Sequence, residues 1–560
     1  MRDEARRGGT ILSGVALALS SALFATMLFG GLSHPLLWQD EAETAMFGRR
    51  VLEYGYPKVH GPRNVVYQFG FDAAMGVKER CDAYIGTTWG QFYFATIGLA
   101  LAGEDGDLYR KTLRLRLPFA LAGASGVLML LLALLPALSG ARARFAFASA
   151  YLLSISACVA LLLHLREVRY YPLATLLSSA LCAVHVLHFA YRRIGYRRYA
   201  FATALLLLLL YHTFFVGFFV FLAALAGDRL LALRKLPQGE RWRALLRSAA
   251  PLVAAVLLVA PALLFFETFS TARAFARHLA LTPAGYLRNL AAIASYLARF
   301  ELLLPALAVG AARAALGRGA APAESPPDGG AGAVSRLLAL VVLSSALVNA
   351  ANPLLYGRYF EIVSPHLTGL FLLEAVRLVR LIGCRARSPR ARGREVAALA
   401  VSLLALLAAL IPKAPDVAGR VAELRDPVRG PLDFAIPFLK ERYADTRRLV
   451  IATNYESYPL MLYLDSQVTV GLSGADSRGD PQQLPDVVIP RRSWPRHLDV
   501  LTGFLRRGRF ERHDLPVRDD PYNTIPELGR WPSVPVPHRF ETAWARSEGE
   551  GLQIFLRAKR

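Results

Sequence analysis

The feature that most constrains this chain is a series of long apolar runs separated by short polar loops. Most runs have about 17 to 25 residues, the length that an α-helix needs to cross roughly 30 Å of hydrocarbon. A chain of 560 residues that is 54% hydrophobic and 19% charged is therefore expected to be a polytopic α-helical membrane protein with about eleven transmembrane helices. The predicted spans are 11–32, 113–138, 145–163, 172–190, 199–211, 213–233, 248–266, 286–312, 335–352, 364–382 and 396–412.

The positions of the basic residues predict how these spans are oriented. Basic clusters occur in every second loop, in RDEARR, GARAR, YRRIGYRR, RLLALRKLPQGERWRALLR, AARAALGRG and RARSPRARGRE. By the positive-inside rule these loops face the cytoplasm. The formal net charge of +23 is then largely a consequence of topology, and a nucleic-acid-binding role loses its support. We expect a multi-pass protein of the cell inner (plasma) membrane.

A large outer loop, residues 33–111, is expected on the extracytoplasmic side. It has a helical pattern over residues 40–54 and a shorter apolar helix in TTWGQFYFATIGLALAG. Because acids flank this helix and a true span there would invert every later loop, we place it along the membrane interface. Within the predicted membrane domain, residues 1–412, residues 317–334 are predicted to be a flexible cytoplasmic linker, since they are rich in Gly, Pro and Ser.

The tail, residues 413–560, has a different pattern from the rest of the chain. The short β-branched runs RRLVIAT, QVTVGL, PDVVIP and LQIFLRA, with the helical stretch SYPLMLYL between the first two, predict a soluble α/β domain outside the membrane. The tail has no Gly-rich phosphate loop, metal-ligand spacing or hydrolase elbow. We expect it to shape a binding face and not to carry out chemistry.

The cysteines and the N-terminus narrow the class further. Cys81, Cys158, Cys182 and Cys384 show no paired spacing, so neither a disulfide framework nor a zinc site is expected. The first apolar run is too long for a signal peptide and lacks a convincing small-residue cleavage site. It is expected to be an uncleaved anchor.

Three carboxylates, Asp40, Glu41 and Glu43, are crowded where the first span leaves the membrane. Acidic side chains beside a bilayer are costly unless they are solvated, paired or used. One interpretation is a solvated helix N-cap, because Asp40 and Glu43 have the spacing of a capping box and their charge suits the helix dipole. The other is a functional site, because the acids precede a long loop with a second interfacial helix.

Other polar residues are predicted at the same membrane surface. Arginines on the outer side run against the topological bias, and a pair of guanidinium groups can hold a phosphate. Glu–Arg pairing and headgroup contacts are the structural alternative, and a lone histidine at the end of a span is often only a hairpin residue. With the first-loop acids, the set suits a site for a membrane-embedded anionic substrate. Its members are Arg166, Glu167, Arg169, Tyr170, His212, Arg358, Tyr359 and Glu361.

These motifs resemble those of GT-C fold glycosyltransferases, the group of the protein O-mannosyltransferases (glycosyltransferase family 39) and the aminoarabinose transferases of lipid A. The resemblance covers about residues 10–380. It rests on the Asp40-Glu41 pair, WGQFYFATIGLALAGEDGDLYRKTLRLRLPFALAG, REVRYYPLATLL and RYFEIVSPHL. It implies a GT-C-like fold, a sugar donor carried on polyprenyl phosphate, and transfer on the extracytoplasmic face. WGQF stands where relatives have PPL, so acceptor recognition is not carried over.

The resemblance also implies roles for the acids. Asp40 would be the base toward the acceptor hydroxyl, Glu41 would assist it, and Glu167 would occupy the place of the acid in the second outer loop. A carboxylate at the membrane exit is accessible to a polar acceptor while the lipid tail stays in the bilayer. The expected reaction is a single displacement with inversion at the sugar carbon.

Cations and aromatic residues are expected to bind the donor. Arg169 and Arg358 are implied to hold the leaving phosphate, because fixed cations stabilise negative charge as it develops. Tyr170 and Tyr359 come from the same loops as these arginines, and His212 interrupts the apolar run LLLLLLYHTFFVGFFVF at its outer turn. All three are expected to contribute to substrate binding. Some relatives bind a divalent metal and others none. We find no convincing ligand set here, so no cofactor is certain and a divalent metal stays open.

Other function classes stay open as well. A transporter or flippase of lipid-linked sugars would need polar residues deep within the spans and detectable repeats, whereas these spans are mostly Leu, Ala and Val at their centres. An oligosaccharide ligase or polymerase is also polytopic, and a non-catalytic scaffold could use the tail as a binding module. The sugar and the acceptor, whether protein, lipid or cell-wall glycan, are not specified by the sequence.

Overall fold

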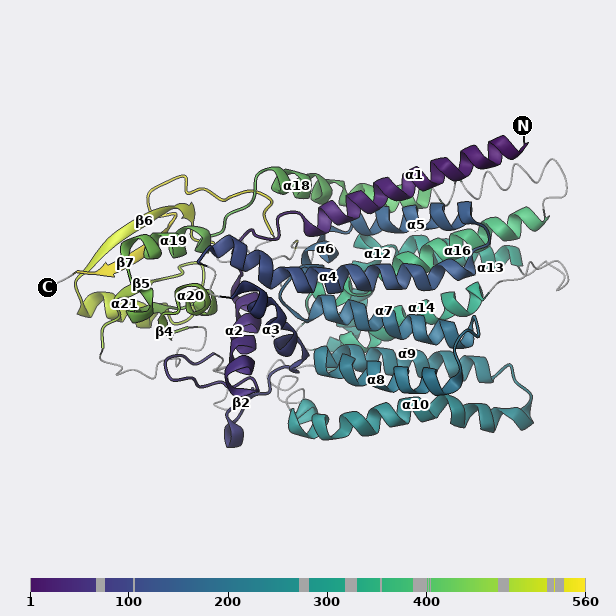
Figure 1. Cartoon of the computed structure of the whole chain (residues 1–560), viewed down its shortest axis with the longest axis horizontal. Coiled ribbons are helices and arrows are strands. Elements are labelled where there is room, and N and C mark those ends of the chain that lie inside the picture. Colours follow the sequence, from purple (N-terminus) through teal and green to yellow (C-terminus); the bar gives the residue numbers. More distant parts are fainter. Residues whose placement is uncertain are drawn as a thin grey trace.

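A computed structural model of the chain shows a helical bundle with a mixed sheet at one end (Figure 1). The N-terminus lies at the far end of the bundle, away from the sheet (Figure 1). The structure describes residues 2–66, 76–103, 106–270, 282–317, 330–352, 355–385, 400, 402, 404–471, 483–520, 528 and 538–558. The predicted linker 317–334 lies mostly outside the described residues, as does part of the predicted span 396–412.

Long apolar helices make up the bundle. In the part of the chain that the structure describes, six helices are long and apolar enough to cross a membrane, or up to eight spans if each of two bent pairs counts as one. The chain is a multi-pass membrane protein, but the predicted count of about eleven spans is not confirmed. The six are α1 (Arg2–Phe29), α4 (Leu108–Leu134), α7 (Tyr170–Phe189), α9 (Phe215–Leu233), α10 (Gln238–Phe265) and α14 (Ala331–Ala350). Helices α8 (Tyr196–Thr213) and α16 (Ser364–Arg385) also belong to the bundle.

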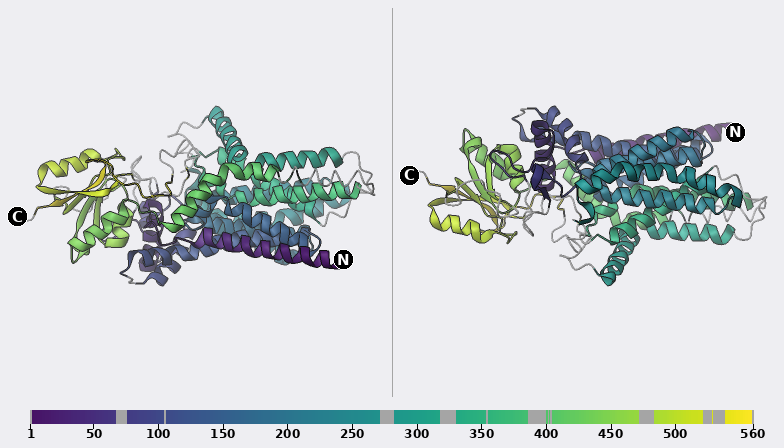
Figure 2. Two further views of the ribbon diagram at one scale, coloured as in Figure 1. Left: turned by 90° about the horizontal axis from the view of Figure 1, so that it is seen from above. Right: turned by 90° about the horizontal axis from the view of Figure 1, so that it is seen from below.

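Two predicted spans, 145–163 and 286–312, are wrong as single straight helices. The first is α5 (Ala141–Ser156) followed by α6 (Val159–Leu165), bent by 83°. The second is α12 (Pro283–Phe300) followed by α13 (Leu303–Gly317), bent by 84°, with α12 directed away from the bundle (Figure 2). Both sides of each break are apolar, so the length of an apolar run cannot reveal the bend.

Polar groups at the two breaks meet around one buried amine. Lys413 Nζ donates to Cys158 Sγ at 3.1 Å and lies 3.3 Å from Glu301 Oε2. Cys158 is the N-cap of α6, and Glu301 is the C-cap of α12. Lys413 therefore links the two bends, because its amine contacts one side chain at each of them. A buried polar side chain is stabilised when it has such a partner.

The first outer loop crosses the end of the bundle. It contains α2 (Gln39–Tyr54), the strand pair β1 (Val77–Lys78) and β2 (Ala83–Tyr84), and α3 (Gly90–Ala102). The predicted helix over residues 40–54 is therefore present. Helices α2 and α3 approach closely, since a Cβ on Gly48 would lie 3.0 Å from Ala95 Cβ.

The tail folds as the predicted α/β domain. Its sheet has the order β4-β3-β5-β7-β6, with β3 parallel to β4 and β5, and β7 antiparallel to β5 and β6. The four predicted β-branched runs are β3, β4, β5 and β7. The elements are α18 (Ala414–Arg425), α19 (Leu432–Arg442), β3 (Val450–Thr453), α20 (Ser457–Leu464), β4 (Gln467–Val470), β5 (Val487–Ile489), α21 (Leu498–Arg507), β6 (Phe510–Arg518) and β7 (Gly551–Arg557).

The α/β domain shares a hydrophobic core with the first outer loop. Leu36 and Phe47 of that loop belong to the same buried cluster as Leu460 and Met461 of α20. Figures 1 and 2 show α2 between the bundle and the sheet. The domain is thus packed directly on the segment that carries the first-loop acids.

Candidate active site

The side chains of Asp40 and Glu43 meet two arginines from other parts of the chain. Arg169, just before α7, places Nη2 3.3 Å from Asp40 Oδ2 and Nη1 3.0 Å from Glu43 Oε2. Arg358, which begins the short helix α15 (Arg358–Glu361), places Nη1 3.6 Å from the same Asp40 Oδ2. We call these four residues the Asp40 cluster. The structure thus brings together three of the residues predicted for the site.

The capping-box interpretation of Asp40 and Glu43 is wrong. The N-cap of α2 is Trp38, and no side chain caps this end of the helix. Because the helix starts at Gln39, Asp40 already lies in its first turn, and a spacing of three puts Asp40 and Glu43 on the same face. That face meets Arg169, so both carboxylates bind a cation and not the helix backbone.

The members of the Asp40 cluster differ in how far they are buried, and this affects pKa values within the cluster. Asp40 is the most exposed member, with 25% of its side chain accessible, against 10% for Glu43 and 12% for Arg169. Burial raises the pKa of the Glu43 carboxyl to about 7, although the neighbouring Arg169 lowers it. The pKa of Arg169 is raised because Asp40 and Glu43 outweigh the effect of its burial. Asp40 is therefore the carboxylate of the cluster that a substrate can reach.

Glu41 has a different environment from its neighbours. Its carboxylate accepts two hydrogen bonds from Arg116 of α4, from Nε at 2.8 Å and from Nη2 at 2.5 Å, and a third from Val168 N at 3.1 Å. Only 2% of its side chain is exposed. The remaining Arg116 nitrogen, Nη1, donates to the carbonyl of Pro35 at 2.8 Å. Glu41 and Arg116 thus tie the start of α2 to the bundle.

Glu167 is also buried and fully engaged. Trp38 Nε1 donates to Glu167 Oε1 at 3.0 Å, and His164 Nδ1 lies 2.9 Å from Oε2. Burial raises the pKa of this carboxyl, and the hydrogen bond with His164 opposes that rise. Only 2% of its side chain is exposed. Within the described residues, the Glu167 carboxylate makes no hydrogen bond or ion pair with the Asp40 cluster. Glu41 and Glu167 are thus both buried, whereas Asp40 of the cluster is partly exposed.

Three consecutive residues before α2 are held from three directions. Leu36 N donates to Asp433 Oδ1 at 3.2 Å, and Leu37 N donates to the Tyr463 hydroxyl at 3.1 Å. Trp38 is held by Glu167. Asp433 and Tyr463 belong to the α/β domain, and burial raises the pKa of Asp433 to about 6. Both sides of the segment that leads into Asp40 are therefore fixed, one by the bundle and one by the α/β domain.

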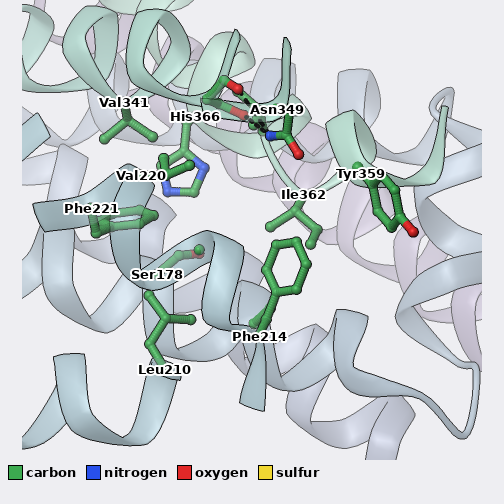
Figure 3. Close-up of a pocket in the computed structure, with 14 residues that line it drawn as sticks. Ser178, Leu210, Phe214, Val220, Phe221, Val341, Asn349, Tyr359, Ile362 and His366 are labelled. Atoms are coloured by element: carbon green, nitrogen blue, oxygen red, sulfur yellow. Dashed lines mark hydrogen bonds between the residues drawn. The ribbon is translucent and has the colours of Figure 1, made fainter. Parts of the chain in front are cut away.

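Aromatic residues connect the cluster to a narrow cavity between the helices. Tyr170 is stacked on Phe214, with ring centroids 4.9 Å apart, and the Arg169 guanidinium lies 5.7 Å from the Tyr170 ring centroid. Phe214 and Tyr359 line a cavity of about 20 Å³ that continues among α7, α9, α14 and α16 (Figure 3). Tyr170 and Tyr359 thus adjoin the Asp40 cluster on its bundle side.

His212 lies apart from these residues. It stands near the end of α8, against Tyr211 and Phe266, with ring centroids 5.5 and 6.2 Å away. Within the described part of the chain, no hydrogen bond or ion pair links it to the Asp40 cluster. The structure does not bring His212 to the site.

The described residues contain no group of three or more His, Cys, Asp or Glu side chains that could hold a metal ion. The polar groups nearest to Asp40 are instead guanidinium groups. An arginine pair suits an anion with several oxygens, such as a phosphate.

Sequence reasoning missed several members of the site. Glu43 was expected to be a cap, and Asp433 and Tyr463 were not expected because they come from the distant α/β domain. One signal could have revealed Arg116. It is an arginine within an apolar span, and ionisable residues in such positions are nearly always paired.

No protein-family model matches the chain. No curated protein matches it either. The structure is similar to that of ArnT from Cupriavidus metallidurans in the apo state, at 14% identity and a TM-score of 0.46, over 83% of this chain and 86% of that one. It is also similar to ArnT from the same organism bound to undecaprenyl phosphate, at 13% identity and a TM-score of 0.44, over 82% and 86%.

Proposed function

We propose that this protein is an integral-membrane glycosyltransferase that moves a sugar from a polyprenyl-phosphate donor to an acceptor hydroxyl. The observation that carries the proposal is the Asp40 cluster, in which a partly exposed carboxylate oxygen lies between Arg169 and Arg358. A transfer of this kind needs a base for the acceptor and cations for the leaving phosphate. The cluster supplies both within one small volume.

The two arginines bind the donor phosphate. Without donor, both guanidinium groups are directed at Asp40 Oδ2. A phosphate offers more acceptor oxygens and a fixed negative charge, so it takes over Arg169 and Arg358 and separates them from Asp40. Donor binding thereby frees the carboxylate at the moment when a base is needed.

The chemical step is then a single displacement. Asp40 takes the proton of the acceptor hydroxyl while the oxygen of that hydroxyl forms a bond to the anomeric carbon of the sugar. The bond from that carbon to the phosphate oxygen breaks, and the electron pair leaves with the polyprenyl phosphate, where the two arginines stabilise the added charge. Attack opposite the leaving group inverts the configuration of the sugar carbon.

Glu41 and Glu167 support this step without touching the substrate. The first forms a buried bidentate pair with Arg116, and the second holds Trp38. Losing one partner of the Glu41–Arg116 pair would leave a buried charge uncompensated, and losing the Trp38–Glu167 contact would leave a buried polar group without its hydrogen bond. Either loss would shift the start of α2, where Asp40 lies. We assign both acids a positioning role, in place of the catalytic roles that the sequence motifs imply.

The position of the cluster suits a lipid-linked donor. Helix α2, which carries Asp40, lies at one end of the bundle (Figure 1). A prenyl chain can stay among the apolar helices there while the phosphate reaches Arg358. The basic turns that join α7 to α8 and α9 to α10 lie at the other end of the bundle (Figure 1). By the positive-inside rule this favours an extracytoplasmic location of the site and of the α/β domain. The acceptor approaches from the water side, beside that domain.

The fate of the sugar–phosphate bond tests the proposal. Purified protein is incubated with a polyprenyl-phosphate sugar that carries a radiolabel in the sugar, and the label left on the lipid is counted. A glycosyltransferase removes the label when acceptor is present. A transporter moves the lipid but leaves the bond intact, so full retention of label with each acceptor class, hydroxyl peptide, lipid and glycan, would refute the proposal.

A further inference from the structure

A basic pocket lies at the end of the bundle opposite the Asp40 cluster. It has a volume of about 620 Å³ and lies between the turn that joins α7 to α8 and the first turns of α10. Figure 1 shows these elements at that end of the bundle. Four arginines line it, Arg192, Arg229, Arg243 and Arg247, against a single acid, Glu240. A volume of this size accommodates a small ligand or a lipid headgroup.

Three of these arginines have no protein counter-charge. In the part of the chain that the structure describes, the side chains of Arg192, Arg243 and Arg247 make no hydrogen bond or ion pair. All three are exposed to the pocket and its mouth. One acid, Glu240, offsets only part of the positive charge of the arginines that line the pocket. An anion that contacts several of them therefore gains more than it would from one surface arginine.

The fourth arginine forms a fixed wall of the pocket. The Arg229 guanidinium lies 3.6 Å from the ring centroid of Phe189, and its Nε donates to Ser248 Oγ at 3.4 Å. The nearby Asp228 is paired with Arg336 at 2.7 Å and His185 at 2.9 Å, and lies 3.7 Å from Arg229. Because Asp228 is shared among three partners, the pocket keeps a net positive charge.

Two helix N-termini reinforce this charge. Tyr196, the first residue of α8, and Gly239, in the first turn of α10, both line the pocket. The N-caps of these helices are Gly195 and Pro237, and neither end has a side-chain cap hydrogen bond. Uncapped N–H groups and the positive end of the helix dipole favour an anion at the same place.

The position of the pocket relative to the membrane surface indicates where the anion comes from. Next to Arg243 and Arg247, α10 exposes Trp242 by 65% and Leu246 by 52%, four residues apart and so on one face. Exposed tryptophan beside apolar side chains is typical of the headgroup level of a membrane. The arginines therefore stand where phosphates of the lipid leaflet lie.

We propose that this pocket binds the phosphate headgroup of an anionic phospholipid from the leaflet at this end of the bundle. Arg192, Arg243 and Arg247 contact the phosphate oxygens, and the acyl chains lie along the apolar face of α10. The site is separate from the Asp40 cluster and does not depend on the proposed transferase activity.

The test is a lipid-binding measurement on the full-length protein in detergent. A fluorescent short-chain phosphatidylglycerol is titrated into the parent, into Arg243→Gln/Arg247→Gln, and into the matched control Arg197→Gln/Arg198→Gln. The control arginines are on α8 at the same end but do not line the pocket. Each lost pocket arginine should weaken binding about fivefold, which corresponds to about 1 kcal/mol. The control pair should change binding less than twofold.

Each of the following results would overturn the proposal. Equal losses of affinity in the two double variants would show that the lipid binds a general basic surface. The phosphatidylcholine analogue of the fluorescent lipid is titrated in the same way, and equal affinity for it would show that binding does not depend on headgroup charge. Displacement of the lipid by millimolar inorganic phosphate would show a site for free anions. If the double variant fails to fold, Arg192→Asn is measured in its place, because Asn tolerates the positive φ of 53° at this position. It should lose about fivefold in affinity, and unchanged affinity would overturn the proposal.

Discussion

At the scale of single residues, the arrangement around Asp40 separates the side chains proposed to meet substrate from the side chains that hold them in place. Asp40 is partly exposed, whereas Glu41 and Glu167 are buried in pairs with Arg116 and with Trp38 and His164. Three acids that look equivalent in the sequence thus have different environments. The environments decide which of them can take a proton from a hydroxyl.

Arg358 supplies the first residue-scale prediction. Arg358→Gln removes a cation at the leaving phosphate, so kcat/KM for donor should fall about 10²-fold, as for the loss of one donor to a developing anion. Both a higher donor KM and a lower kcat are expected, because the phosphate gains charge in the transition state. Steady-state rates at varied donor concentration measure this. Arg425→Gln, an exposed arginine at the end of α18, is the matched control, and equal rates in both variants would remove Arg358 from the site.

Glu43 supplies the second residue-scale prediction, a dependence of donor binding on pH. Its pKa of about 7 means that the carboxyl is mostly neutral at pH 6 and mostly charged at pH 8. The charged form competes with the phosphate for Arg169, so donor affinity should fall about tenfold, equivalent to about 1.4 kcal/mol, as pH rises from 6 to 8. Equilibrium donor binding at several pH values measures this. Glu43→Gln should keep the affinity of the low-pH form throughout, and an unchanged pH profile in this variant would exclude Glu43 as the cause.

At the scale of elements, the α/β domain contacts the segment that leads into α2, the helix of the proposed active site. Tyr463 of α20 accepts a hydrogen bond from Leu37 N, and its hydroxyl lies 2.6 Å from Thr112 Oγ1 of α4. The expectation that the domain only shapes a binding face is therefore incomplete. The domain also fixes the segment between α1 and α2 against the bundle.

Tyr463→Phe tests this positioning. The substitution keeps the ring but removes the hydroxyl, so kcat should fall about tenfold while donor KM stays unchanged. The protein should lose on the order of 1 kcal/mol of stability for each hydrogen bond. Steady-state kinetics and thermal unfolding measure the two effects. Tyr443→Phe is the control, because this tyrosine is in the same domain and packs against the same core, but within the described residues its hydroxyl makes no hydrogen bond to the first loop. A Tyr463→Phe variant with lower stability but unchanged kcat would contradict the positioning role.

At the scale of the whole molecule, the bundle separates two charged ends. The Asp40 cluster and the α/β domain lie at one end, and the basic pocket lies at the other (Figures 1 and 2). The positive-inside rule then places Ser547 outside the cell membrane and Arg193 in the cytoplasm. In a chain without its native cysteines, Ser547→Cys should react with an impermeant thiol reagent in intact cells and Arg193→Cys should not. The reverse pattern would invert the topology.

Much of this architecture could be predicted from local patterns. The span of α7 follows from apolar length, and β3 and β5 follow from β-branched runs. Strand β6 was missed because its sequence FERHDLPVR is mostly charged and polar, as suits a strand at the sheet edge. The bends beside α6 and α13 were missed because packing, not composition, sets their angle.

The site itself could also be predicted only in part, because only some of its residues give a signal in the local sequence. Arg169 and Arg358 stand out in the sequence because they oppose the charge bias of their side of the membrane, and the structure brings them to Asp40. Asp433 and Tyr463 give no such signal, since their partners are backbone groups about 400 residues earlier in the chain. Contacts of that kind depend on the packing of whole domains.

The most direct test of the central claim is the pair of rate and affinity measurements on Asp40→Asn. The amide cannot take a proton, and a positioned base contributes about 10²–10⁴-fold, so the transfer rate should fall by that factor. The same change frees Arg169 and Arg358 from their carboxylate, so donor affinity should be unchanged or higher. Glu53→Gln, an exposed acid of the same helix, should keep both values. Transfer by Asp40→Asn within a few-fold of the parent would contradict the role of Asp40 as the base.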